Sequence, residues 1–133
     1  MLWLLDTNIV IAAVKGVPSV RARLQQVLAV DVVLSPIVLG ELQFSAEKSR
    51  FPERNRAKLE KVTEGFPVMA LDFASSRIYG RIRNELERVG QPIGANDLWI
   101  AAQGMALDAT VVTDNTREFE RVAGLRLENW LSP

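Results

Sequence analysis

The segment Leu2-Trp3-Leu4-Leu5-Asp6-Thr7-Asn8 brings four apolar residues directly against three small polar ones. A short apolar run favours a buried β-strand, and Asp, Thr and Asn are residues that cap helices and form turns. The segment therefore predicts a strand over 2–5 that runs into a helix. Because a strand followed by a helix is the repeating unit of α/β proteins, this segment indicates the class of fold.

Strand-like and helix-like segments alternate along the rest of the chain. Further strands are expected over 32–34, 68–71, 109–113 and 125–127. Between them apolar residues recur at helical spacing, with helix starts at Pro18-Ser19, Ser35-Pro36 and Phe51-Pro52 and an expected cap at Asn96. The alternation predicts an α/β fold with a central parallel sheet of four to five strands, flanked by helices on both faces.

Length and composition limit the possible functions. The chain's 133 residues suit a single domain, 1–133, that is large enough to bury a core. We find no run long enough for a membrane span and no signal-peptide pattern, so we expect a cytoplasmic protein with no membrane partner. Cysteine and histidine are absent, which excludes disulfides, thiolate metal sites and serine–histidine triads. Hydrolysis would have to depend on carboxylates.

Four acidic residues stand where such a fold would place a site. Asp6 ends the first expected strand and Asp114 follows the strand over 109–113. Ligands of parallel sheets bind beyond the carboxyl ends of the strands, so both carboxylates should lie at that edge. Glu41 and Asp97 lie on helices that follow strand or loop segments, which would bring them to the same edge. We therefore expect the four carboxylates to share one pocket.

Each acid also has a purely structural interpretation, as a helix cap, a partner of a helix dipole, a turn residue or a solvated helix residue. However, Glu41 is the only charged residue within 32–46, and Asp97 the only one within 89–107. Isolated carboxylates in apolar surroundings are costly to bury, and a divalent cation is a common remedy when no Lys or Arg is adjacent. A cluster of oxygen ligands suits magnesium, or manganese, rather than zinc.

Magnesium bound to carboxylates serves phosphoryl chemistry, because the ion activates water and neutralises charge in the transition state. Hydroxyl and amide side chains close to the acids could orient the attacking group. The candidates, which serve equally well as ordinary turn residues, are Thr7, Asn8, Thr113 and Asn115.

Four segments of the chain resemble the PIN-domain toxins called VapC. They are Leu5-Asp6-Thr7-Asn8, Gly40-Glu41, the stretch GANDLWIAA over 94–102, and VTDNTREF over 112–119. The resemblance implies a parallel α/β PIN fold, magnesium-dependent endoribonuclease activity, a homodimer, and inhibition by a cognate VapB-type antitoxin. It assigns metal binding to Asp6 and Asp97 and an acidic active-site role to Glu41.

The fourth acid departs from the pattern of the family. Many members place it two residues after the threonine, where this chain has Asn115, whereas here the carboxylate is Asp114, one residue after Thr113. Either the turn shifts by one residue and Asp114 is catalytic, or the site uses three acids with Asn115 as a polar ligand.

The closing stretch over 118–130 resembles the branch of VapC toxins that cuts initiator tRNA in the anticodon loop, so an RNA substrate, a tRNA by analogy, is expected. Because 16 basic and 16 acidic residues cancel, RNA binding must be local. The run over 48–61 has six basic and two acidic residues and is either an RNA-backbone patch or a solvated helix face. This run and the preceding helix, with Leu39, Leu42 and Phe44, could instead receive an apolar segment of the antitoxin.

Two other functions compete with this assignment. A magnesium-dependent phosphatase of the haloacid dehalogenase type also begins with a strand that ends in aspartate. It needs a second aspartate two residues later, where this chain has Asn8. The second alternative is a degenerate PIN domain kept for binding protein, which the full set of acids disfavours.

Overall fold

The computed structural model describes residues 1–132 and is built on a four-stranded parallel sheet. The strands lie in the order β2-β1-β3-β4, with bounds β1 Trp3–Leu5, β2 Val32–Val33, β3 Thr110–Val112 and β4 Arg126–Glu128. Every pairing between these strands is parallel. The predicted parallel sheet is therefore confirmed, and all its carboxyl ends lie along one edge.

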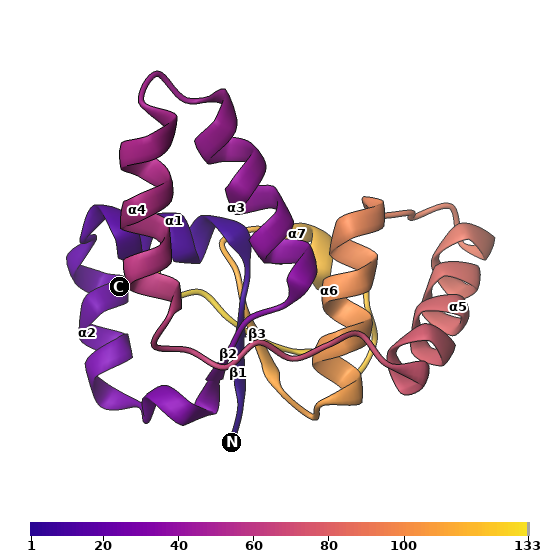
Figure 1. Ribbon diagram of the computed structural model, residues 1–133. Coiled ribbons are helices and arrows are strands. Elements are labelled where there is room, and N and C mark those ends of the chain that lie inside the picture. Colours follow the sequence, from indigo (N-terminus) through magenta and orange to yellow (C-terminus); the bar gives the residue numbers. More distant parts are fainter. Residues whose placement is uncertain (133) are drawn as a thin grey trace.

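Helices cover both faces of the sheet, as predicted. They are α1 Thr7–Lys15, α2 Pro18–Gln26, α3 Pro36–Lys48, α4 Pro52–Thr63, α5 Phe73–Arg88, α6 Ala95–Ala106 and α7 Thr116–Phe119, with a 3-10 turn at Ala29–Asp31. Helices α1 and α2 lie on one side of the strands and α5 and α6 on the other (Figure 1). The strand order requires this, because the chain moves outward from β1 to β2 and back across β1 to β3, and right-handed crossovers then use opposite faces.

Local sequence explains where most helices begin. Asp6 caps α1, and its carboxylate accepts a hydrogen bond from the backbone N–H of Thr7 at 2.8 Å. Ser35 caps α3 through the N–H of Ile37 at 3.2 Å, and Asp72 caps α5 through the N–H of Ser75 at 2.9 Å. Helices α2, α3 and α4 each start with proline, which suits the first helical turn.

Two local predictions were wrong. The strand expected over 68–71 is reduced to an isolated parallel bridge between Val68 and Leu34. Just beyond this bridge the carbonyl of Met69 accepts a hydrogen bond from the buried side chain of Gln103 at 2.6 Å, instead of one from a neighbouring strand. Asn96 is also not a cap, because α6 begins at Ala95 and Gly94 occupies the capping position.

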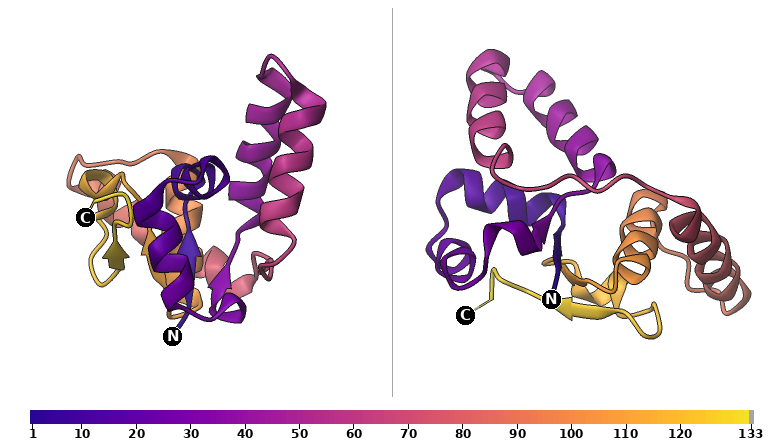
Figure 2. Two further views of the ribbon diagram at one scale, coloured as in Figure 1. Left: turned by 90° about the vertical axis from the view of Figure 1, so that its left-hand side faces the viewer. Right: turned by 60° about the horizontal axis from the view of Figure 1, so that its bottom comes forward.

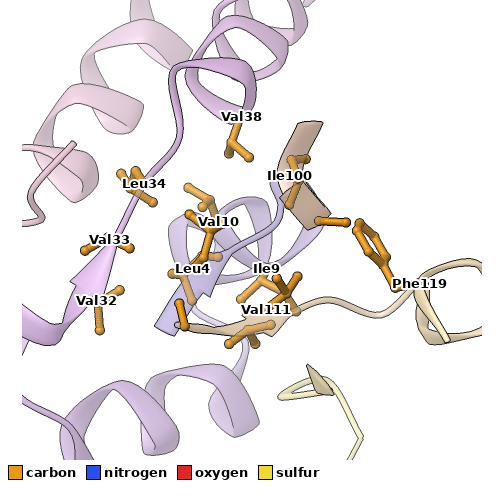
Figure 3. Packing of buried hydrophobic residues seen from close by; sticks show 14 of the residues in the cluster. Leu4, Ile9, Val10, Val32, Val33, Leu34, Val38, Ile100, Val111 and Phe119 are labelled. Atoms are coloured by element: carbon orange, nitrogen blue, oxygen red, sulfur yellow. The ribbon is translucent and has the colours of Figure 1, made fainter. Parts of the chain in front are cut away.

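The core lies between the sheet and the helices on its two faces (Figure 3). It includes Leu4 and Val111 from adjacent strands, Ile9 from α1 and Ile100 from α6, all fully buried. Helix α6 lies so close to β3 that a Cβ atom on Gly104 would come within 2.6 Å of the side chain of Val111. This close packing holds the last turn of α6 against β3, and the helix carries Asp97 in its first turn.

Helices α3 and α4 form an antiparallel hairpin that stands out from the rest of the molecule (Figure 2). Because α3 follows β2 and Ser35 without a long loop, its first turns lie at the carboxyl edge of the sheet and its far end projects away from it. Within residues 1–132, none of the helices has the length and apolar character needed to cross a membrane.

Candidate active site

Asp6 is the central acid of the carboxyl edge and is buried, with 7% of its surface exposed. One carboxylate oxygen accepts the N–H of Thr7, and the other accepts the hydroxyl of Thr113 at 2.8 Å. Parallel pairing of Leu5 with Val112 brings the next residues of both strands side by side. Burial raises the pKa of Asp6, although these two hydrogen bonds act in the opposite direction. The carboxylate is thus held in one orientation at an energetic cost.

Asp97 lies in the first turn of α6, at the same carboxyl edge of the sheet as Asp6. Its pKa is raised from 3.8 to about 7, first by burial and then by the negative charges of Asp6 and Glu118. The side-chain amide of Asn115 approaches its carboxylate at 3.4 Å. A carboxyl with such a pKa exchanges its proton near neutral pH, which is typical of functional sites.

Glu41 reaches the edge from the second turn of α3. Burial raises its pKa, and the charge of Asp6 raises it further. Its buried atom Oε1 and the hydroxyl of Thr7 form no hydrogen bond of good geometry within residues 1–132. The side chains of Thr7 and Asn96 nevertheless lie close enough to Glu41 to lower its pKa in part. These incompletely bonded oxygens beside Asp6 leave room for a further ligand.

Asp114, the fourth acid expected at this edge, lies differently from Asp6, Glu41 and Asp97. Asp114 is exposed at the margin, where its carboxylate accepts a hydrogen bond from the side chain of Asn8 at 3.2 Å, and its charge adds to the raised pKa of Asp6. Asn115 points inward and connects Asp97 to Glu118. The structure thus brings Asp6, Glu41 and Asp97 together and leaves Asp114 at the rim.

Glu118 is the acid that sequence reasoning missed. One carboxylate oxygen accepts the amide of Asn115 at 2.8 Å and the other accepts the backbone N–H of Gly94 at 2.7 Å. These hydrogen bonds, that of Asn115 first, lower its pKa, so Glu118 stays charged beside Asp97. Asn115 and Glu118 are three residues apart at the start of α7, which places both on one helix face. This spacing is the feature of the sequence that could have indicated Glu118 as a site residue.

The donor atoms of the site fit a hard divalent cation. Within residues 1–132, no three acidic side chains converge closely enough to hold an ion by themselves. Magnesium does not require such a cage, since it binds one or two carboxylates and completes its shell with water and substrate phosphate. The oxygen-only donors and the incompletely bonded Oε1 of Glu41 agree with that mode of binding.

Comparison with known proteins matches residues 3–125 to the family model described as "PIN domain". The chain belongs to the PIN-domain family. Among curated relatives of this PIN domain, the "tRNA(fMet)-specific endonuclease VapC" of Shigella flexneri is 43% identical over 129 residues, which cover 96% of this chain and 97% of that protein. The "Ribonuclease VapC2" of Rickettsia felis is 39% identical and covers 98% of each chain.

Solved structures agree with this assignment. The crystal structure of DNA-bound VapBC from Salmonella typhimurium contains a chain that matches this PIN domain with a TM-score of 0.91 and 40% identity, over 98% of this chain and 99% of that one. The PIN domain described here is thus a ribonuclease of the VapC type, with the α/β PIN fold that the sequence predicted. The phosphatase alternative is therefore wrong.

Proposed function

We propose that this chain is the toxin of a VapBC-type pair, a magnesium-dependent endoribonuclease that cuts initiator tRNA in the anticodon loop and so inhibits translation. The observation that carries the proposal is that Asp6, Glu41 and Asp97 lie near enough to one another, at the carboxyl edge of a VapC-type PIN domain, for the charge of Asp6 to raise the pKa of the other two. Initiator tRNA follows from the relative named as a "tRNA(fMet)-specific endonuclease", at 43% identity. Manganese would serve in place of magnesium.

In this proposal Asp6 and Asp97 would hold the cation, which would activate water and neutralise negative charge on the phosphate. Asp6 is suited to this role because the donors from Thr7 and Thr113 fix its two oxygens. Asn115 and the charged Glu118 orient Asp97.

The chemical step is the hydrolysis of one phosphodiester bond. Water adds to phosphorus, one bridging P–O bond breaks, and the leaving oxygen takes up a proton. Glu41 is proposed to receive the proton of the attacking water, because it lies beside Asp6 at the carboxyl edge and burial raises its pKa, which makes it a stronger base than an exposed carboxylate. Asp114 remains a proposed catalytic residue, acting from the rim through its charge on Asp6.

The antitoxin is proposed to bind on the other side of α3. A hollow of about 420 Å³ lies between α1, α3 and α4, and its apolar lining includes Ile11, Val14, Leu42 and Leu59. Lys15 and Lys58 also line it, so an apolar segment with acidic neighbours fits the surface. Of the residues considered from the sequence, Leu42 lines this hollow, whereas Phe44 lines a different one. Solved VapBC complexes of relatives support a partner of this kind, and the resemblance also implies a homodimer.

The test is cleavage of initiator tRNA by the purified chain. We expect cuts at few positions with magnesium or manganese, none with EDTA, and a loss of at least about 100-fold in rate for Asp6→Asn or Asp97→Asn, since both ligands of the ion are needed. Elongator tRNAs serve as the control substrates for specificity. The proposed homodimer is tested separately by analytical sedimentation.

Two controls make the result specific. Asp31→Asn removes a carboxylate from the 3-10 turn, away from the edge, and should cut at the wild-type rate. Undiminished cleavage by both Asp6→Asn and Asp97→Asn would show that these two residues are not part of the active site. A folded wild type that binds RNA without cutting it would favour the degenerate binding module.

A further inference from the structure

A second hollow, of about 380 Å³, opens directly beside Glu41. It is lined by Pro36, Ile37, Gly40, Glu41, Phe44 and Asn96. The ring of Phe44 is 66% exposed, although it is large and apolar. Glu41 and Phe44 are three residues apart on α3 and lie on one face of the helix. An acid of the candidate site and an exposed aromatic ring thus share the same depression.

Gly40 gives the hollow an open floor. It lies in the interior of α3, where glycine is less stable than alanine by about 0.5 to 1 kcal/mol. A Cβ atom at this position would meet nothing within 4 Å, so no contact inside the protein explains the glycine. Its φ angle is not left-handed either. Gly40 therefore leaves room at the helix surface for a close approach from outside the chain.

A free cation stands on the far side of Phe44. The ammonium of Lys48 lies 5.8 Å from the centre of the Phe44 ring, and Lys48 forms no ion pair within residues 1–132. Residues 41, 44 and 48 follow one helix face, which separates Glu41 from Lys48 by roughly 10 Å along the axis. The order along this face is therefore carboxylate, aromatic ring and cation.

We propose that the hollow formed by Gly40, Glu41 and Phe44, here called the Phe44 subsite, takes one unpaired RNA base next to the phosphate that is cut. The base stacks on Phe44 above Gly40, and Lys48 binds a neighbouring phosphate. Stacking on an exposed aromatic ring with a cation beside it is how proteins bind unpaired RNA. The inference rests on the proposed function and adds a positioning and specificity element to it.

Charge favours RNA over a protein segment as the occupant. An apolar segment seated on Phe44 would have to cover the carboxylate of Glu41 and the ammonium of Lys48, and burying such charges unpaired is costly. A nucleotide stacks its flat face on the ring and leaves a phosphate for Lys48. The apolar side chain of Leu42 faces the other hollow, so α3 presents two chemically different surfaces.

The test uses a synthetic anticodon stem–loop of initiator tRNA, with each loop base removed in turn, and measures binding in EDTA, where no cleavage occurs. Wild type should lose about 5- to 150-fold in affinity when the stacked base is removed, the range expected for one base–aromatic stack. Phe44→Ala should bind the intact loop about as weakly as wild type binds the loop without the stacked base. Removing that same base should then weaken the binding of Phe44→Ala by less than about a further twofold. Phe44→Trp should restore the dependence on the base.

Two further variants separate the subsite from folding. Gly40→Ala should melt at or above the wild-type temperature, because alanine favours a helix, yet bind RNA more weakly because its methyl group enters the hollow. Phe73→Ala, which removes a ring that is 77% exposed at the start of α5, should leave RNA binding unchanged.

Equal base-removal penalties in wild type and Phe44→Ala at every loop position would overturn the inference. A changed oligomeric state of Phe44→Ala with unchanged RNA affinity would also overturn it, since the ring would then be a protein contact. Wild type that binds the loop but does not cut it with magnesium would end the proposed function, while the base-removal comparison would still decide whether Phe44 stacks.

Discussion

Asp97 is the residue at which the electrostatic cost of the site is most concentrated. Its pKa is about 7 against an ordinary value of 3.8, because it is half-buried and lies near the negative charges of Asp6 and Glu118. A carboxyl with a raised pKa binds its proton more tightly in the folded protein than in the unfolded chain. Its contribution to stability is therefore present at low pH and is lost as the pH rises from about 4 to about 7.

We predict that Asp97→Asn stabilises the metal-free protein by an amount that grows with pH. The difference from wild type should be smallest at pH 4 and largest at pH 7 and above, at most about 4 kcal/mol since each unit of pKa corresponds to about 1.4 kcal/mol. Water that reaches the half-buried carboxyl reduces this figure. Urea denaturation in EDTA at pH 4, 5.5, 7 and 8 measures it.

The control for this effect is Asp108→Asn, which changes a largely exposed aspartate and should show no comparable rise with pH. If the free energies of unfolding of wild type and Asp97→Asn differ by the same amount at every pH, Asp97 does not titrate as its surroundings require, and the cluster is looser than described.

At the scale of elements, the basic residues over 48–61 of the α3–α4 hairpin make different kinds of contact. Arg56 forms an ion pair with Glu47, and Lys58 lines the hollow between α1, α3 and α4. Arg50 and Arg54 instead lie on the ring of Phe51, at 5.4 and 5.8 Å from its centre. These two arginines at the projecting end of the hairpin are thus available to phosphates.

We predict that Arg50→Gln combined with Arg54→Gln weakens RNA binding and flattens its salt dependence. Each phosphate contact to a single strand contributes about 0.7 to the slope of log affinity against log salt, so two lost contacts should reduce the slope by about 1.4. Titrations of the stem–loop in EDTA between 50 and 200 mM salt, roughly the range over which such effects are large, measure the slope.

The control at this scale is Arg56→Gln, which removes one positive charge from α4, the helix that also carries Arg54, but from a residue already paired with Glu47. It should leave the slope almost unchanged. Equal slopes for the double variant and wild type would mean that the end of the hairpin is a solvated surface that does not contact RNA phosphates.

For the whole molecule, the acidic edge joins parts of the chain that are far apart in sequence. Asp6 follows β1, Glu41 lies on α3, Asp97 on α6 and Glu118 on α7. These carboxylates repel one another in the metal-free protein, and a bound cation would replace that repulsion with shared attraction. The cation should therefore stabilise the fold as a whole and not one element of it.

We predict that millimolar magnesium raises the melting temperature of wild type more than that of Asp97→Asn. A ligand at 100 times its Kd adds about 2.7 kcal/mol to the stability of the state that binds it, and the variant has lost one proposed ligand. Thermal melts of both proteins in EDTA and in magnesium measure the difference. Equal shifts in both proteins would show that the ion binds somewhere else.

The sequence by itself determined most of the framework. The apolar run of Leu2 to Leu5 next to Asp6 was sufficient for the first strand and helix, and Ser35-Pro36 for the start of α3. These features depend on neighbours within a few residues, so local rules describe them. The rule that the carboxyl ends of parallel strands share an edge then predicted Asp6 and Asp114 at that edge, and the helices that carry Glu41 and Asp97 were expected to bring these two acids to the same region.

Only the tertiary structure decided the details of that region. The carbonyl of Met69 accepts a hydrogen bond from the side chain of Gln103, 34 residues away, where the expected strand over 68–71 would have paired with a neighbouring strand. Asn115 turns inward because Glu118 and Asp97 accept its amide, which leaves Asp114 at the rim. Such choices depend on which distant groups meet once the helices have packed on the sheet, and hydrogen bonds and burial at that point outweigh local preference.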